Sequence, residues 1–315
     1  MPRVLFVKTS SLGDVVHHCP AVSDAARALP GAAIDWVVEE SFAAVAAMHR
    51  NVRRVIPVAL RRWRARAWSP AVWREIGAFL RTLAAEHYDY VVDTQGLMKS
   101  AVIAALAKGE RHGLDRASAR ESLAARFYHR RHGVARGLHA VERNRWLTAA
   151  ALGYAVQGPC DYGLFIGDSQ GKSRGGPYAV LLTMTSRADK LWPETLWREL
   201  ARGLAARGLR LLLPWGSEAE RARCERVAAG IEGASVPPRM PIAELAGVLG
   251  AARCAVGVDT GLAHLAVALG VPTAGIYCGS DPELTGLYGA RTKNLGGPAA
   301  PPAAAEVLEA LEGLC

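Results

Sequence analysis

Short apolar segments alternate with segments of helical periodicity along almost the whole chain, and this alternation constrains the fold more than any other feature. In the first half, each apolar run of strand length leads through a polar loop into a segment whose apolar residues recur at helical spacing. Such a pattern predicts a parallel, doubly wound α/β sheet. The expected strands are Val4–Val7, Ala33–Val38, Val55–Val58 and Tyr88–Asp93, and the expected helices are 15–29, Phe42–Met48, Trp73–Ala85, Lys99–Ala107 and His139–Leu152. Residues 110–137 are basic and are expected to be irregular.

The alternation restarts after the Gly/Ser-rich segment Gly167–Pro177, which predicts a linker. A chain of 315 residues is long enough for two domains. We therefore expect domains at 1–165 and 166–315 that face a cleft, with the last helix as a segment able to return to the first domain. The second set of strands is Tyr178–Leu182, Leu209–Leu213, Cys254–Val258 and Thr273–Tyr277, and the helices are Glu194–Ala206, Glu218–Ala229, Ile242–Gly250, Leu262–Leu269 and Ala303–Leu311.

Charge is divided unequally between the two halves. Residues 1–160 contain 23 Lys and Arg against 13 Asp and Glu, whereas residues 161–315 contain 15 against 16. The first half therefore carries +10 and the second −1, which together give the net charge of +9. An anionic partner is predicted for the first half. A basic surface of this kind also suits peripheral contact with an anionic membrane.

The loop after the first strand offers a candidate catalytic acid or base. Lys8 and Asp14 flank this loop, and ligands of open α/β sheets sit at the carboxyl ends of strands. A carboxylate there can deprotonate a hydroxyl group, with its pKa tuned by burial and by Lys8. The alternative is that Asp14 only caps the following helix. The loop holds a single glycine, which weakens a dinucleotide-binding interpretation without excluding it.

Three loops of the second half suit a nucleoside diphosphate. Hydroxyl groups and a lysine follow the strand at 178–182, and these can bind phosphate oxygens. A strand, a tight Gly turn and a helix N-terminus meet at Val258–His264, where backbone N–H groups favour a pyrophosphate. A carboxylate after the strand at 209–213 can accept hydrogen bonds from ribose hydroxyls. The alternatives are a polar loop, an ordinary helix cap and a solvated helix start. The candidates are Thr185, Ser186, Lys190, Glu218, Glu220, Asp259, Thr260, Gly261 and His264.

An Arg/Trp-rich segment, Arg61–Trp68, contains four arginines and two tryptophans. Arginine forks bind carboxylates and phosphates, and tryptophan suits sugar stacking or a membrane interface. No nucleic-acid-binding motif accompanies it, so nucleic acid is not expected as a partner. A solvated basic face is the alternative.

The six cysteines have no paired or metal-ligand spacing, which favours reduced thiols and the cytoplasm. No window approaches the ~20 apolar residues of a membrane helix. No acidic metal cluster is visible either, and no metal or other cofactor is expected.

Together these motifs resemble the ADP-heptose:lipopolysaccharide heptosyltransferases of glycosyltransferase family 9, most closely the heptosyltransferase I group. The resemblance runs nearly end to end. It is carried by Val7–Asp14, Trp36–Glu40, Arg61–Arg64, Asp93–Leu97, His139–Arg143 and Val258–His264. It implies a GT-B fold of two Rossmann-like domains, with the acceptor on the first and the donor on the second. It also implies an inverting, metal-independent transfer of L-glycero-D-manno-heptose from ADP-heptose to the Kdo of Kdo2-lipid A, at the cytoplasmic face of the inner membrane.

The resemblance also implies roles for individual residues. Asp14 would be the base, and Lys190 would act in catalysis as well as in donor binding. Glu220 and Met240 would line the nucleoside, with Glu218 as an alternative to Glu220. The remaining donor residues are Thr185, Ser186, Asp259, Thr260, Gly261 and His264, and the acceptor residues are Lys8, Ser11, Arg61, Arg62, Arg64 and Arg120.

Three other interpretations stay open at this point. A heptosyltransferase II would differ in its acceptor only. A two-domain oxidoreductase would bind NAD. A non-catalytic sugar- or nucleotide-binding module would keep its biological activity in an Asp14→Ala variant.

Overall fold

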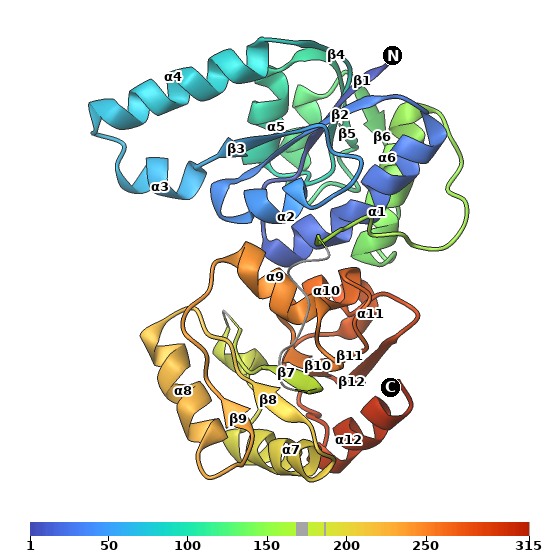
Figure 1. Ribbon diagram of the computed structural model, residues 1–315. Coiled ribbons are helices and arrows are strands. Elements are labelled where there is room, and N and C mark those ends of the chain that lie inside the picture. Colours follow the sequence, from blue (N-terminus) through green and yellow to red (C-terminus); the bar gives the residue numbers. More distant parts are fainter. Residues whose placement is uncertain (168–175, 186, 315) are drawn as a thin grey trace. The chain divides into compact units, whose positions relative to one another are not determined.

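The computed structural model describes residues 1–167, 176–185 and 187–314. The chain forms two compact units, Met1–Leu164 and Phe165–Cys315 (Figure 1). Ser186 and most of the predicted linker lie outside the described residues. No helix in these described ranges combines the length and the apolar character that a membrane span requires.

The first unit is built on a six-stranded sheet in the order β3-β2-β1-β4-β5-β6, with every neighbouring pair parallel. Strand β1 is central because its residues 4–7 are fully buried and pair on both sides. The order reverses between β1 and β4, which makes the loops after these strands the expected ligand site. The strands are β1 (Arg3–Val7), β2 (Ala33–Glu39), β3 (Arg54–Val58), β4 (His87–Asp93), β5 (Lys108–Leu114) and β6 (Arg130–His132).

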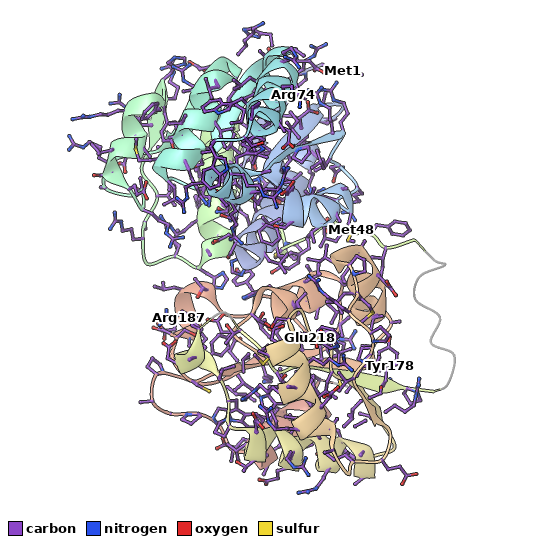
Figure 2. The ribbon with its side chains drawn as sticks, turned by 90° about the vertical axis from the view of Figure 1, so that its left-hand side faces the viewer. Met1, Met48, Arg74, Tyr178, Arg187 and Glu218 are labelled. Carbon is purple, nitrogen blue, oxygen red and sulfur yellow. The ribbon has the colours of Figure 1, made fainter. Side chains whose placement is uncertain are left out.

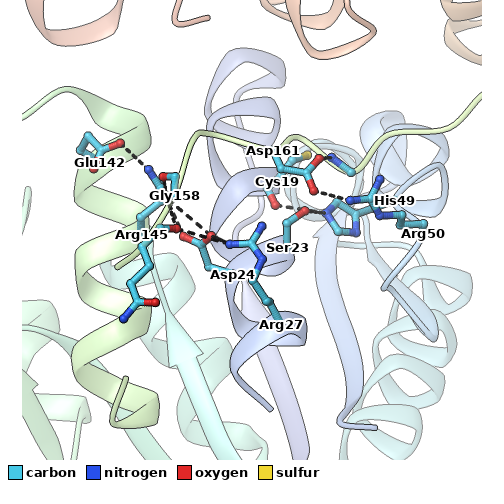
Figure 3. Close-up of polar contacts among 12 residues, drawn as sticks. Cys19, Ser23, Asp24, Arg27, His49, Arg50, Glu142, Arg145, Gly158 and Asp161 are labelled. Carbon is cyan, nitrogen blue, oxygen red and sulfur yellow. Dashed lines mark hydrogen bonds and ion pairs between the residues drawn. The ribbon is translucent and has the colours of Figure 1, made fainter. Parts of the chain in front are cut away.

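Helices cover this sheet and fix its loops. The helices are α1 (Leu12–Ala28), η1 (Glu40–Phe42), α2 (Ala43–Ala47), α3 (Leu60–Ala65), α4 (Pro70–Ala84), α5 (Met98–Leu106), η2 (Ser122–Phe127) and α6 (Ala140–Leu152). Helices α1 and α6 pack together and are joined by a buried ion pair (Figure 3). Arg145 Nε lies 2.7 Å from Asp24 Oδ2, with the two side chains 5% and 3% exposed. Arg145 also pairs with Glu142, and Asp24 with Arg27.

The second unit repeats the topology of the first. Its parallel sheet has the order β12-β11-β10-β7-β8-β9, so β7 and β10 occupy the places of β1 and β4. Helix α12 packs against α7 and β11 of the same unit. The strands are β7 (Tyr178–Leu182), β8 (Arg210–Leu212), β9 (Ala234–Ser235), β10 (Cys254–Val258), β11 (Thr273–Tyr277) and β12 (Thr292–Gly296). The helices are η3 (Ala188–Lys190), α7 (Glu194–Ala206), α8 (Glu218–Ala228), α9 (Ile242–Gly250), α10 (Gly261–Ala268), α11 (Pro282–Thr285) and α12 (Ala304–Glu312).

The expectation that 110–137 is irregular is wrong, because β5, η2 and β6 lie there. Strand β5 is polar and is held by backbone pairing with β4, so no apolar periodicity marks it. Gly113 in β5 leaves space for the ring of Tyr128, since a Cβ at this position would stand 2.3 Å from that ring. The Tyr128 hydroxyl then donates to Asp93 Oδ2 at 2.7 Å. The short elements β9, α11 and β12 were not predicted either, because they too show no apolar periodicity.

Candidate active site

Asp14 stands in the first turn of α1 and caps this helix. The backbone N–H of Ser11 donates to Asp14 Oδ2 at 2.8 Å, and the Ser11 hydroxyl donates to the same oxygen at 3.2 Å. The structure therefore confirms that Asp14 caps α1. The cap uses only one oxygen of the Asp14 carboxylate, because among the described residues no hydrogen bond reaches Oδ1. Asp14 is half-buried and Ser11 is exposed.

Lys8 directly follows β1, and its side chain is buried in the interior of the first unit. Its ammonium donates to Thr94 O at 3.1 Å and to Asn144 Oδ1 at 3.3 Å, which joins the loops after β1 and β4 to helix α6. Burial lowers the pKa of Lys8, while the charges of Asp14 and Asp93 oppose this shift. Lys8 and Asp14 are thus close enough for their charges to interact, as predicted. Lys8 also holds two loops and α6 together, a role that the sequence did not show.

A set of side-chain bonds holds the loops after β1 and β4 against each other. Thr9 donates to Gln95 Oε1 from both its backbone N–H and its hydroxyl, each at 2.8 Å. Gln95 Nε2 returns a bond to Ser10 O at 2.7 Å. The fully buried Asp93 accepts from Gln95 N at 2.8 Å. Burial raises the pKa of Asp93, and these hydrogen bonds oppose the shift. The carboxyl ends of β1 and β4 therefore form one rigid platform.

Cations surround this platform. Arg120 and Arg143 both lower the pKa of Lys8 by their charge. Burial, followed by the charges of Arg136 and Arg120, lowers the pKa of Arg143 itself. Arg143 and Arg136 donate to the carbonyls of Ser118 and Ala119 at 2.8 and 2.6 Å. Across the described ranges, Arg120, Arg136 and Arg143 form no ion pair with a carboxylate, which leaves their charge available to an anion. Of these three arginines, only Arg120 is predicted from the sequence as an acceptor residue, although Arg143 ends the family motif His139–Arg143.

The arginines of the Arg/Trp-rich segment divide into two kinds. Arg62 is already occupied, because its guanidinium lies 3.0 Å from Glu40 Oε2 and 2.8 Å from Glu75 Oε2. These carboxylates raise the pKa of Arg62 above its usual range. Arg61 and Arg64 are exposed and have no ion pair among the residues described. An acceptor carboxylate or phosphate would meet Arg61 and Arg64 directly, whereas Arg62 would first have to leave its carboxylates.

In the second unit, Lys190, Ser280 and His264 converge on Asp259, which follows directly after β10. Lys190 Nζ lies 2.5 Å from Asp259 Oδ2, and the Ser280 hydroxyl donates to the same oxygen at 2.7 Å. Burial alone would raise the pKa of Asp259, but its polar neighbours His264, Lys190 and Ser280 lower it well below its usual range. His264 Nε2 lies 3.9 Å from Asp259 Oδ1. The Asp259 carboxylate is thus held ionised, and it faces the Lys190 ammonium, the His264 ring and the Ser280 hydroxyl.

The loop after β7 meets this cluster. Thr185 Oγ1 donates to Asp259 O at 2.9 Å, so the loops after β7 and β10 are joined as the matching loops of the first unit are. Thr260 is the N-cap of α10 and Gly261 its first residue. Asp259, which Lys190 contacts, directly precedes this N-cap, and His264 lies in the first turns of the helix. A lysine and a helix N-terminus brought together in this way can bind a diphosphate. Ser280 is a member of this cluster that the sequence did not single out.

The two candidate ribose-binding carboxylates differ in their surroundings. Glu220 Oε2 accepts from Gly216 N at 2.7 Å, at the loop after β8. Glu218 is 77% exposed and pairs with Arg221 on the outside of α8 (Figure 2). The geometry therefore favours Glu220 as the carboxylate that belongs to this loop. Met240 is half-buried and directly precedes the N-cap of α9. No group of three or more His, Cys, Asp or Glu residues in the described ranges is arranged to hold a metal ion.

A family model described as glycosyltransferase family 9 (heptosyltransferase) matches residues 76–312. The chain belongs to this family. The lipopolysaccharide heptosyltransferase 1 of Pseudomonas aeruginosa is 51% identical over 93% of this chain and 83% of its own length. The enzyme of the same name from Escherichia coli K12 is 48% identical over 91% of this chain and 91% of its own.

Solved structures agree with this membership. The Escherichia coli heptosyltransferase WaaC with ADP has a TM-score of 0.94 and 45% identity, covering 99% of this chain and 100% of that one. The ADP-heptose lps heptosyltransferase II of Escherichia coli is 18% identical with a TM-score of 0.81, over 99% of this chain and 98% of that one, and shares the fold. The predicted GT-B class of two Rossmann-like units is confirmed, and the chain is a glycosyltransferase. The oxidoreductase and the non-catalytic module are not favoured.

Proposed function

We propose that this family 9 enzyme transfers L-glycero-D-manno-heptose from ADP-heptose to the Kdo of Kdo2-lipid A, a step in building the lipopolysaccharide inner core. The observation that carries the proposal is the pair of switch-point sites, one rich in cations that have no carboxylate partner in the described ranges and one suited to a diphosphate. Relatives at about half identity are named lipopolysaccharide heptosyltransferase 1. A solved relative at 43% identity was obtained with ADP-2-deoxy-2-fluoro heptose.

The second unit supplies the donor site in this proposal. Lys190 and the first turn of α10 stabilise the negative charge that develops on ADP as the sugar leaves. Asp259 holds Lys190 at 2.5 Å and so positions its ammonium before the donor binds. Thr185, Ser186 and His264 complete the phosphate and sugar contacts, while Glu220 and Met240 line the nucleoside. The fixed cation and the helix N-terminus do the work for which many transferases use a metal, so we expect no metal cofactor.

The first unit supplies the acceptor site. Asp14 keeps Oδ2 on the helix cap and offers Oδ1 to the acceptor hydroxyl, which it deprotonates as the hydroxyl attacks the anomeric carbon. A direct attack opposite the leaving ADP inverts the configuration. Arg61, Arg64 and Arg120 bind the acceptor's carboxylates and phosphates, with Lys8 and Ser11 shaping the loop. The cationic first half also supports peripheral contact with the anionic cytoplasmic face of the inner membrane.

The decisive variant is Asp14→Asn, because asparagine keeps an oxygen for the Ser11 cap and loses the basic carboxylate. ADP release from ADP-heptose with deacylated Kdo2-lipid A should fall about 100- to 10,000-fold, the range for a lost general base. Binding of ADP-heptose, measured by calorimetry, should stay within twofold. Asp115→Asn is the matched control, since Asp115 likewise accepts from a backbone N–H three positions away in the sequence, that of Ser118.

Turnover by Asp14→Asn equal to that of the wild type would remove Asp14 as the base. The same assay separates acceptors. Turnover with a Kdo-terminated acceptor is expected, whereas turnover only with an acceptor that already carries the first heptose would assign the chain to the heptosyltransferase II reaction.

A further inference from the structure

A trough runs along the first unit between α3, α4 and α5. It consists of two adjoining hollows of about 510 and 390 Å³. Leu60, Trp63, Ile76 and Lys99 line both hollows, so the two lie side by side. Helix α4 lies beside α5 and contacts β3 (Figure 1). All the lining residues belong to one compact unit, and none of the proposed catalytic groups is among them.

The larger hollow carries the charged side chains of the trough among apolar ones, and it adjoins the loop of Asp14. Glu39, Arg61, Arg64 and Lys99 line this larger hollow. Lys99 Nζ donates to Ser10 Oγ at 2.7 Å, which ties this hollow to the loop after β1. Burial lowers the pKa of Lys99, and the charges of Glu39 and Asp14 oppose the shift. An anion bound at Arg61, Arg64 and Lys99 would therefore lie next to the proposed base.

The other hollow is apolar and open to solvent. Apart from Lys99, its lining is aliphatic, aromatic or Met. Leu80, Val102 and Leu106 form its rim with 36%, 42% and 48% of their surface exposed. Trp73, which lines the larger hollow, is 63% exposed. Large apolar side chains that face water in one contiguous place mark a binding surface, because their exposure is unfavourable.

Three cationic side chains in one hollow and an almost wholly apolar lining in the adjoining one match a single class of ligand, an anionic lipid with its headgroup at the catalytic loop. We propose that the trough binds one acyl chain of the lipid acceptor, with the phosphates or carboxylates of its headgroup held by Arg61, Arg64 and Lys99. The proposal rests on the proposed function and adds a lipid subsite to it. The subsite would select acylated acceptors and would fix the acceptor hydroxyl by holding both ends of the lipid.

The test compares two acceptors in the ADP-release assay, Kdo2-lipid A in detergent and its deacylated form. Val102→Glu with Leu106→Glu places two charges on the exposed rim of α5 without changing a buried residue. Leu123→Glu is the control, because Leu123 is 49% exposed in the same unit and lines neither hollow. We expect the double variant to raise KM for the acylated acceptor at least tenfold and to leave KM for the deacylated acceptor within twofold, while the control changes neither.

Two results would overturn the subsite, an unchanged KM for the acylated acceptor and an equal rise of KM for both acceptors. If the unchanged KM comes together with lost sedimentation on vesicles containing phosphatidylglycerol, the trough is a bilayer contact instead. Failure of the proposed function is distinguishable, because the wild-type enzyme would then turn over neither acceptor.

Discussion

The two units share a strand order, yet they handle charge in opposite ways. The first unit has a buried ion pair, Arg145–Asp24, outside the catalytic loop, while Arg120, Arg136 and Arg143 near that loop have no carboxylate partner among the residues described. The second unit pairs its charges at the site itself, where Lys190 and Ser280 converge on Asp259. An acceptor that brings its own anions suits the first arrangement. A leaving diphosphate suits the second, because the lysine is positioned in advance.

The largest effect is expected at the buried ion pair of the first unit. Arg145→Met leaves Asp24 as a buried charge without its main partner, which costs about 3–5 kcal/mol of unfolding free energy. Hydrogen exchange in urea, followed in peptides of α1 and α6, measures this loss. Arg27→Met is the control, since Arg27 is 52% exposed and its pair with the same Asp24 contributes about 1 kcal/mol or less. Equal losses in both variants would show that the buried pair is not the stronger one.

At the second site, the same kind of change should affect chemistry more than stability. Lys190→Gln removes the cation that faces the leaving diphosphate, and we expect kcat to fall about 100- to 1,000-fold. Arg187→Gln is the matched control, because Arg187 lies in the same loop, is exposed and pairs with Asp189 (Figure 2). A Lys190→Gln enzyme within tenfold of the wild type would end the proposed role of Lys190. A large loss of thermal stability in this variant would instead make Lys190 a structural residue.

Mild acid should distinguish the units, because the first one buries a neutral histidine. His49 Nε2 lies 3.1 Å from Cys19 O (Figure 3). The other ring nitrogen, Nδ1, accepts from Asn51 N. Burial lowers the pKa of His49 to about 4. Between the unfolded-state pKa of about 6.5 and this value, the unfolded chain binds the proton and the folded chain does not, so stability falls as pH falls. The loss from His49 approaches about 3 kcal/mol at pH 4.

The second unit should behave differently over the same range. The depressed pKa of Asp259 gives stability that is present above its unfolded value of about 3.9 and is lost only as pH falls below that. Urea unfolding at pH 7 and pH 4.5, read by hydrogen exchange in peptides of each unit, measures the difference. His49→Gln should flatten the pH dependence of the first unit. An unaltered slope in this variant would exclude His49 as its source.

The sequence predicted the fold where burial imposes a pattern. Strands β1, β7 and β10 and helices α7 and α9 lie where apolar periodicity put them, and the two switch-point loops follow from that. Strands β5 and β6 were not predictable in this way, since both are polar, are held by backbone pairing and carry little periodicity. For the site, the sequence supplied the residue types and the family motifs, and the structure brings Asp259, Lys190 and His264 together as those motifs implied.

Tertiary structure alone decided how each charge is used. Lys8, Lys99 and Lys190 look alike in the sequence, yet their partners differ. Lys8 bonds a backbone carbonyl of the loop after β4, Lys99 bonds Ser10 in the catalytic loop, and Lys190 faces the carboxylate of Asp259. Arg62 and Arg64 stand two positions apart, and only Arg62 meets Glu40 and Glu75. The physical reason is the same in each case. Apolar burial is a property of a segment and shows in its periodicity, whereas the partner of a charge comes from a distant part of the chain and is fixed only by folding.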